Sequence, residues 1–352
     1  MEISCQTYKI YFEDAIADLV AHVDLDSYSS LFVLCDENTE RDCLPLITDH
    51  LPAAKVLRIN SGEENKTIET CLEIWRQLLD LGADRKSCLI NLGGGVIGDM
   101  GGFCASTFMR GMAFIQMPTT LLSQVDASVG SKLGVDLDAH KNLVGLFNDP
   151  VAVCIYTGFL KTLDSRELTS GYAEVIKHAL IQDAELWDHL QLIDNLHSTE
   201  IDWKSLVSRS VEIKKEVVNQ DPKEQGLRKI LNFGHSIGHA IESERLSSEH
   251  PLTHGEAIAI GMICEAHISS EREMISKNTL DTICAYVLKH FEKDSHFSPV
   301  LSTILARMSR DKKNEKGEKL LSLLDGEGSC IFNVAVSDNE VLQALDYYAT
   351  LA

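Results

Sequence analysis

The fold class of this chain is decided by NLGGGVIGDMGGF, residues 91–103. This segment follows an apolar run typical of a buried strand and leads into a helical pattern. It contains G-x-G-x-x-G as Gly93, Gly95 and Gly98. Glycines at such a junction permit a tight turn and let backbone N–H groups approach a phosphate at the start of a helix. A turn selected only for close packing is the alternative, but the position after a strand favours a phosphate-bearing ligand.

Two details separate this segment from the usual dinucleotide-binding fingerprint. It does not follow the first predicted strand, and no acidic residue lies about twenty positions later, where Pro118 and Thr119 stand. The motif therefore indicates a phosphate-bearing ligand without specifying which one.

Apolar runs and helical patterns alternate on both sides of this segment. TIETCLEIWRQLLDLG (67–82) has helical spacing and ends at Gly82. Alternation of this kind predicts a mostly parallel sheet covered by helices. The runs that resemble buried strands are LFVLC (31–35), KVLRI (55–59), SCLINL (87–92), AFIQM (113–117) and VAVCIY (151–156).

The sequence pattern of the chain changes after about residue 160. Long helical patterns follow one another, and strand-like runs nearly vanish until CIFNVAV (330–336), which precedes a helix opened by Ser337 and Glu340 in capping-box spacing. A chain of 352 residues exceeds what one hydrophobic core usually serves. We therefore expect an α/β domain of the nucleotide-binding type at 1–156 and a mostly α-helical domain at 157–352.

Composition excludes several classes of partner and location. The chain has 32 basic and 53 acidic side chains, a net charge of −21, which argues against nucleic acid and anionic membrane surfaces. The ten cysteines are scattered without a C-x-x-C pair, as in a reduced cytosolic protein. No run approaches the roughly eighteen apolar residues of a membrane span, and the N-terminus lacks a signal-peptide pattern. We expect a cytoplasmic protein.

Histidines mark the strongest candidate site in the helical part. LNFGHSIGHAIE (231–242) puts His235 and His239 four residues apart, on one face of a helix, and His254 follows in LTHGEAIAIG. Two histidines with a carboxylate and an open position make a catalytic zinc site. A lone histidine is more often a core residue; three of them beside glycines favour the metal site. The residues alone do not say which two histidines bind.

Other charged residues have both a functional and a structural interpretation. Glu174 and Lys177 lie one turn apart on an otherwise apolar helical pattern, either as a partly exposed pair or in a functional role. SGEENKT (61–67) fits an ordinary turn and helix cap. The polar stretch 119–142 predicts a ligand-facing loop, and its Lys132 and Lys141 suit an anionic group.

Motifs along the whole chain resemble those of the 3-dehydroquinate synthase family. Their number and common order over two domains leave little room for coincidence. The motifs that carry the resemblance are GEENK, GGGVIGDMGGF, MRG, PTTLLSQVDASVGSKLGV, HKN, FLKTL, SGYAEVIKHALI, KKEVV, GLR, LNFGHSIGHAIE, HGEAIAIGM and RDKK.

The resemblance implies a fold, cofactors and a reaction. The N-terminal domain would be a Rossmann-like sheet that holds NAD, and the helical domain would hold Zn²⁺, with Co²⁺ as an alternative. The implied reaction converts a sugar phosphate, 3-deoxy-D-arabino-heptulosonate 7-phosphate, into 3-dehydroquinate and phosphate in the shikimate pathway. NAD oxidises the C5 alcohol, phosphate leaves by elimination, the hydride returns, and an aldol step closes the ring. The family's habit predicts a homodimer.

The resemblance also implies site residues. The metal ligands would be Glu174, His235 and His254, with His239 beside the substrate as a proton-handling group and Glu224 as a proton acceptor. NAD would contact Asp36, Asn38, Glu63, Lys66, Gly94, Gly95, Val96, Asp99, Thr119, Thr120, Lys132, Lys141, Phe159 and Thr162. The substrate would contact Arg110, Asp126, Lys132, Asn142, Lys177, Lys214, Arg228, Asn232 and a lysine of the 312–313 pair, assigned as Lys312. A local cluster of cations suits a phosphate and a carboxylate.

Departures from the family pattern are small. Ser61 stands where many relatives have aspartate, and Ser131 and Leu133 replace the commoner Gly and Thr. The segment between His235 and His254 is slightly longer than in many relatives and holds His250, a competing ligand that ranks below His254.

Three other functions fit part of the pattern. Another NAD- and metal-dependent sugar-phosphate cyclase would alter the substrate-contacting residues, whereas Arg228, Asn232 and His239 are retained. A metal-dependent alcohol dehydrogenase would release NADH and would not need so many anion-binding cations. A non-catalytic regulator would have lost at least one ligand or pocket cation.

Overall fold

The computed structural model describes residues 1–138, 140–246, 248–297, 301–310 and 319–351, which form two compact units. The first unit comprises Met1–Asp164 and Trp203–Lys215, and the second comprises Ser165–Asp202 and Glu216–Ala352. Helix α8 (Trp203–Gln220) thus contributes to both units. The division of function at 156/157 stays a prediction.

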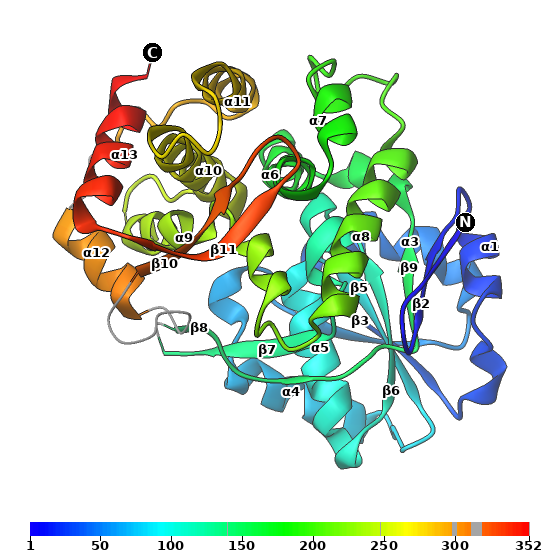
Figure 1. The fold of residues 1–352 in the computed structure, drawn as a ribbon. Helices are drawn as coiled ribbons and strands as arrows, with labels where there is room; N and C mark the ends of the chain where they lie inside the picture. Colours follow the sequence, from blue (N-terminus) through cyan, green and yellow to red (C-terminus); the bar gives the residue numbers. More distant parts are fainter. Residues whose placement is uncertain (139, 247, 298–300, 311–318, 352) are drawn as a thin grey trace. The chain divides into compact units, whose positions relative to one another are not determined.

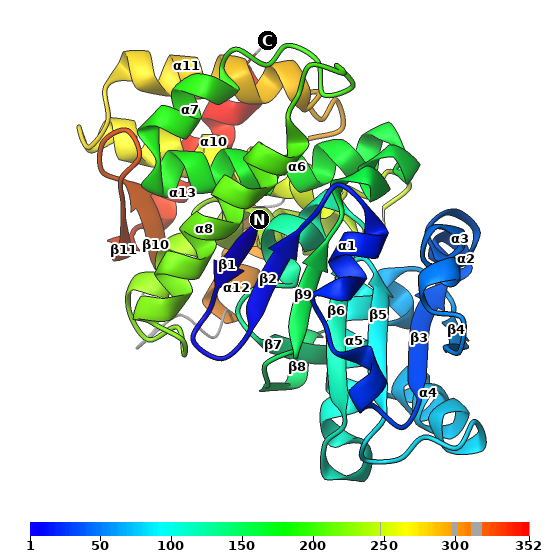
Figure 2. The ribbon, with the colours of Figure 1, turned by 90° about the vertical axis from the view of Figure 1, so that its right-hand side faces the viewer.

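The first unit is built on a seven-stranded sheet in the order β1-β2-β9-β6-β5-β3-β4. All its pairings are parallel except that of β1 with β2, so the predicted mostly parallel sheet is confirmed. Figure 2 shows these strands side by side. The strands are β1 (Glu2–Ser4), β2 (Lys9–Phe12), β3 (Leu31–Asp36), β4 (Lys55–Ile59), β5 (Cys88–Gly93), β6 (Ala113–Pro118) and β9 (Ala152–Ile155).

Both faces of this sheet are covered, because successive side chains of a strand point to opposite faces. Phe32 and Leu34 of β3 pack into one apolar cluster with α4 (Ile68–Asp80) and α5 (Gly95–Thr107). Val33, between them, packs into a second cluster with residues of the short helices α1 (Ile16–Ala21) and α3 (Leu44–Ile47). A further short helix, α2 (Glu37–Asp42), follows β3 directly.

The polar stretch 119–142 was expected to be a loop, and this expectation is wrong in two places. Ser123–Ala127 forms a short π-helix, η5, whose first three residues are buried. β7 (Lys132–Leu137) pairs with β8 (His140–Phe147) in an antiparallel hairpin. Leu133 and Val135 are buried, and Leu133 lies where a side chain at Gly102 of α5 would stand. Leu133 therefore anchors the hairpin on α5, and Val135, two residues on, lies on the same face of the strand.

The second unit is mostly helical, as predicted, and α10 is its central helix (Figure 1). Ala, Ile, Gly and Met occur all around α10, so nearly its whole length is buried. α13 begins at a capping box of Ser337 and Glu340, which confirms that prediction. The helices are α6 (Ser165–Gln182), α7 (Ala184–Leu190), α9 (His235–Arg245), α10 (His254–Glu271), α11 (Lys277–His290), α12 (Leu301–Arg310) and α13 (Asp338–Thr350).

A small hairpin of β10 (Lys319–Leu324) and β11 (Cys330–Val336) completes this unit. Within the described part of the chain, every helix is too short or too polar to cross a membrane.

Candidate active site

Three helices of the second unit bring a carboxylate and two imidazoles together. Glu174 lies in the middle of α6, whereas His235 and His254 are the first residues of α9 and α10. Oε1 of Glu174 lies 3.4 Å from Nε2 of His235 and 3.7 Å from Nε2 of His254. A tetrahedral ion with Zn–ligand bonds of 2.0–2.1 Å needs donor atoms about 3.3 Å apart. Both distances from Oε1 of Glu174 are therefore close to the spacing that such an ion requires.

The hydrogen bonding of Glu174 also fits a cation. Its side chain is fully buried, and Oε2 accepts from Nζ of Lys177. Oε1 accepts no well-formed hydrogen bond from any residue that the structure describes. A buried oxygen without a donor costs about 1–3 kcal/mol, and a metal ion at this position would remove that cost.

The charge states of this group differ. Burial raises the pKa of Glu174, but Lys177, His235 and His254 outweigh it and hold the pKa well below its usual range. Burial and the Lys177 ammonium hold the pKa of His235 well below its usual range, so this imidazole is neutral. Burial lowers the pKa of His254, but Glu174 and Glu242 raise it to about 9. A metal ion that bound here would find the Glu174 carboxylate ionised and the His235 imidazole neutral. It would displace a proton from His254.

The remaining ring nitrogens of both histidines face acceptors. Nδ1 of His235 lies 3.1 Å from the Phe233 carbonyl oxygen, and Nδ1 of His254 lies 3.5 Å from Oε2 of Glu242. An acceptor at Nδ1 holds the proton there and leaves Nε2 with its lone pair, as in most histidine–metal sites. Glu242 was not among the predicted site residues; it lies on α9 seven residues after His235, two turns along the same helix face.

His239 lies beside both predicted histidine ligands. Its ring centre is 5.0 Å from that of His235 and 5.6 Å from that of His254. Nitrogens of the three histidines lie within 4.8 Å of one another. A set of three histidines is thus a geometric alternative to the set with Glu174, and the choice of ligands stays a prediction. His250 does not belong to this group, because its ring stacks on His296 at 4.3 Å.

A loop and a short helix of the same unit carry three more predicted residues. The carboxylate of Asp221 accepts hydrogen bonds from the backbone N–H groups of Gln225, Gly226 and Arg228, which closes the loop. Nδ2 of Asn232 donates to Oε1 of Glu224 at 2.8 Å. The buried Arg228 donates to the Pro222 carbonyl oxygen at 2.7 Å. The structure thus brings Glu224 and Asn232 into contact.

In the first unit, the predicted NAD-binding residues follow the carboxyl ends of the sheet strands. Carboxyl ends of parallel strands meet at one edge, which is where α/β sheets bind nucleotides. Asp36 and Asn38 follow β3, Glu63 and Lys66 follow β4, Gly94, Gly95, Val96 and Asp99 follow β5, Thr119 and Thr120 follow β6, and Phe159 and Thr162 follow β9. Phe159 is fully buried in the apolar cluster with Val33, so its side chain is a core residue.

The glycine-rich turn is shaped as the sequence predicts. α5 begins at Gly95 after the cap residue Gly94, and neither has a side chain to cover the first N–H groups of the helix. A Cβ at Gly94 would lie 3.1 Å from Thr120, and one at Gly98 would lie 3.2 Å from Gln116. These glycines therefore serve close packing and also leave a helix N-terminus open to a phosphate.

Lys66 connects three elements at this edge. Its buried ammonium donates to Oδ2 of Asp99 at 2.6 Å and to Oδ1 of Asn142 at 2.7 Å. Burial lowers the pKa of Lys66, but the Asp99 and Glu63 carboxylates outweigh it and raise the pKa, so the ammonium stays charged. The ends of α4, α5 and the β7–β8 hairpin are thereby linked.

Other predicted residues of the first unit are paired with one another or exposed. Nζ of Lys214 donates to both the carbonyl and the carboxylate oxygen of Asp126 at 2.6 Å. Nζ of Lys141 lies 3.8 Å from Glu63. Arg110 and Lys132 have exposed side chains. Lys312 lies outside the described residues.

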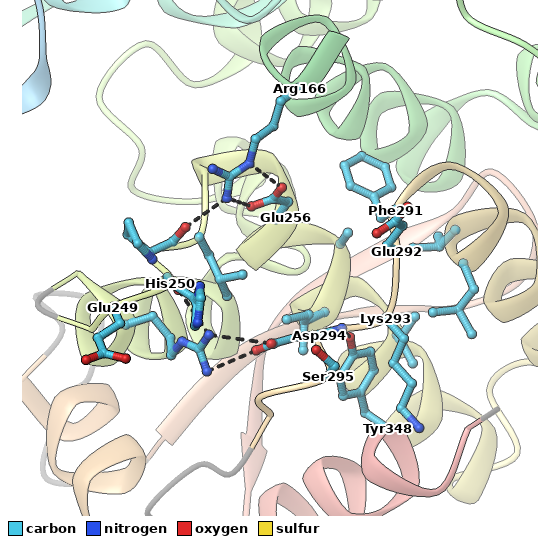
Figure 3. Close-up of a pocket in the computed structure, with 18 residues that line it drawn as sticks. Arg166, Glu249, His250, Glu256, Phe291, Glu292, Lys293, Asp294, Ser295 and Tyr348 are labelled. Atoms are coloured by element: carbon cyan, nitrogen blue, oxygen red, sulfur yellow. Dashed lines mark hydrogen bonds and ion pairs between the residues drawn. The ribbon is translucent and has the colours of Figure 1, made fainter.

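A pocket of about 420 Å³ in the second unit was not anticipated (Figure 3). Its lining combines apolar residues of α10 and α11 with charged residues, and includes none of the predicted site residues. Arg166 is paired with Glu256, and Arg245 with Asp294, so these charged groups bond to each other. The Arg166–Glu256 pair also supports the start of α10, where His254 lies.

The fold and the site together define a class of proteins with a parallel α/β unit and a helical unit that holds a buried glutamate–histidine cluster. Family models for the N-terminal and C-terminal parts of 3-dehydroquinate synthase match residues 56–170 and 171–314. The chain belongs to the 3-dehydroquinate synthase family, which confirms the family and function predicted from the sequence.

One curated relative agrees with this assignment, and two solved structures share the fold. The chain is 39% identical over 351 residues to the 3-dehydroquinate synthase of Parabacteroides distasonis, covering 98% of this chain and 97% of that protein. A 2-epi-5-epi-valiolone synthase from Streptomyces hygroscopicus, solved with NAD⁺ and Zn²⁺, has a TM-score of 0.83 and 27% identity and covers 99% and 98% of the two chains. A 2-deoxy-scyllo-inosose synthase, solved with carbaglucose-6-phosphate, NAD⁺ and Co²⁺, has a TM-score of 0.82 at 24% identity and covers 99% of both chains.

Proposed function

We propose that this chain converts 3-deoxy-D-arabino-heptulosonate 7-phosphate into 3-dehydroquinate and phosphate. It would act as a carbon–oxygen lyase with one NAD that is restored in each turnover. The observation that carries the proposal is the convergence of Glu174, His235 and His254 in a member of this family. The proposal includes a divalent cation, Zn²⁺ or Co²⁺, held by these three residues.

The two cofactors would supply the redox chemistry and the polarisation of oxygen. When bound, NAD accepts and returns a hydride, and the cation polarises the substrate alcohol. On the protein side, Lys177 keeps the Glu174 carboxylate ionised. The open start of α5 and the residues after β3, β4 and β6 would bind NAD through its phosphates and ribose.

Protons at the substrate would be handled by His239 and Glu224. The place of His239 one turn after His235 supports a role in holding a proton near the oxygen that the cation polarises. The hydrogen bond from Asn232 orients the carboxylate of Glu224, which supports a role for Glu224 as the proton acceptor. The family resemblance implies this division, and side-chain chemistry agrees with it: an imidazole changes charge near neutral pH, whereas a carboxylate accepts a proton from an acidified carbon.

The substrate would be held by charged and amide side chains, whose cations would bind its phosphate and carboxylate. In the first unit these are Arg110, Asp126, Lys132, Asn142 and Lys214, and in the second unit Lys177, Arg228 and Asn232. The chain as a whole has a net charge of −21, so the proposal requires that these cations form a local positive site on an acidic protein. We also propose that the protein is a homodimer and that it is cytoplasmic.

The test is phosphate release from the heptulosonate phosphate, with NAD and Zn²⁺ each added or withheld, while absorbance reports NADH. We expect release that needs both cofactors and leaves no net NADH. Accumulating NADH would instead indicate an alcohol dehydrogenase. Bound NAD and Zn²⁺ without turnover would direct the search to other sugar phosphates, the substrates of the related cyclases. Glu271→Gln, at an exposed position of α10, is the matched control and should keep full activity.

A further inference from the structure

The start of α9 lacks a cap of its own. Gly234, the residue before His235, has φ +77, a conformation that favours glycine. A Cβ there would lie 2.6 Å from Cγ of Met262 and 3.1 Å from the Ile258 carbonyl oxygen. The position therefore excludes Ser, Thr, Asp and Asn, the residues that usually cap a helix with their side chains. The first N–H groups of α9 need an acceptor from elsewhere.

Glu265 of α10 supplies that acceptor. Its side chain is fully buried. Oε2 accepts from the backbone N–H of Gly234 at 2.6 Å, and Oε1 accepts from that of Ile237 at 3.3 Å. One carboxylate thus bonds the cap position and the third residue of α9. A negative charge at a helix N-terminus is also favoured by the helix dipole.

Close packing of α9 against α10 couples the position of Glu265 to that of His235. A Cβ at Gly261 would lie 1.9 Å from the Gly234 carbonyl oxygen, and one at Gly238 would lie 2.9 Å from the Ala257 carbonyl oxygen. The backbones of α9 and α10 therefore touch at Gly261 and Ala257, about one and two turns before Glu265 on α10. His235 is the first residue of α9, so any shift of the helix start moves its imidazole relative to Glu174.

We propose that Glu265 is a positioning residue that fixes the start of α9, so that Nε2 of His235 faces Glu174 before any metal binds. This inference rests on the proposed metal site. Glu265 lies eleven positions after His254 on the same helix, and it would fix the position of the other histidine ligand, His235.

The experiment compares Zn²⁺ affinity, measured by competition with a chromophoric chelator, for the full-length protein and Glu265→Gln. Glutamine keeps the shape but turns an NH₂ group toward one of the two N–H donors. We expect the dissociation constant to rise about tenfold or more. Glu271→Gln should stay within about twofold of the unchanged protein. Ile283→Val, which removes a methyl group from the core of α11, should lower the melting temperature without weakening Zn²⁺ binding.

Equal Zn²⁺ affinity of Glu265→Gln and the unchanged protein would overturn the inference while leaving the proposed function intact. An unchanged protein that bound no Zn²⁺ would defeat the proposed function itself. A second measurement needs no variant, in case Glu265→Gln does not fold. Hydrogen exchange of the Gly234 and Ile237 amides should be slow in the metal-free protein. Fast exchange that slows only with Zn²⁺ would show that the metal, not Glu265, orders the start of α9.

Discussion

The nucleotide-type edge of the first unit and the glutamate–histidine cluster of the second are assembled in different ways. At the sheet edge, strand order brings the residues together, and most of them stand in the helical or irregular segments that follow strands. In the cluster, buried side chains from α6, α9 and α10 meet, and each has a partner that orients it. The edge should therefore tolerate the loss of one side chain, whereas the cluster should fail as a whole.

The largest expected effect is that of Glu174→Ala. Loss of the carboxylate removes a ligand and leaves the buried Lys177 ammonium without its partner, so turnover should fall by about a thousandfold or more, together with metal retention. Metal content after dialysis and phosphate release measure both. Glu174→Gln keeps the volume and separates the lost charge from the cavity. Activity that persisted in chelator-treated Glu174→Ala would exclude Glu174 as a ligand.

His239→Ala should separate proton handling from metal binding. We expect the metal to be retained and turnover to fall by about a hundredfold or more, the usual loss for a general acid or base. Metal analysis beside kcat distinguishes the two roles. A metal-free variant would mean that the three-histidine set, not the set with Glu174, binds the ion.

Lys66→Met tests the tolerance of the sheet edge. Asp99 and Asn142 would lose their common donor, so NAD affinity should fall by about tenfold, or about 1.4 kcal/mol, as measured by calorimetry. Zn²⁺ affinity should not change, because neither Lys66 nor its two partners is a residue of the glutamate–histidine cluster. Lys86→Met, at an exposed lysine of the same unit, is the control. A parallel fall in Zn²⁺ affinity would contradict the independence of the two regions.

The smallest effect concerns the loop that carries Glu224 and Arg228. Burial raises the pKa of Asp221, but the backbone N–H groups of Gly226, Gln225 and Arg228 outweigh it and lower the pKa below its ordinary value of 3.8. A lowered pKa stabilises the fold above the ordinary value, and that stabilisation is lost as pH falls through the folded-state pKa.

Asp221→Asn should therefore lower the melting temperature at pH 7, by the equivalent of about 1–2 kcal/mol. The difference from the unchanged protein should shrink as pH falls below about 4. Calorimetry over pH 3 to 7 measures it, with Asp281→Asn, at an exposed position, as the control. A stability difference that stayed constant across this range would show that the shape of the Asp221 side chain, and not its charge, stabilises the loop.

The sequence predicted what local patterns determine. Five strands, the glycine-rich turn and the helical second unit follow from periodicity and breaker residues. The capping box at Ser337 follows from residues three positions apart. The cap of α10 is of the same kind, since Thr253 and Glu256 bond each other's backbone.

What the sequence did not predict depends on contacts between distant segments. The β1–β2 hairpin is too short to stand out, and β7 owes its place to Leu133 packing on α5. Glu242 and Glu265 look like ordinary polar residues of helical patterns, because nothing local distinguishes a buried carboxylate from an exposed one. Only the fold places them against His254 and the start of α9.

The contact between Gly234, Gly238 and Gly261 has a consequence for how variants of this chain are interpreted. These three positions have no room for a single methyl group, whether or not the protein ever meets a metal. A saturation library selected only for folding should therefore deplete substitutions there as strongly as one selected for growth. Loss of substitutions at these glycines would reflect the packing of the fold. Only positions that are depleted in the growth selection and not in the folding selection would reflect the chemistry of the site.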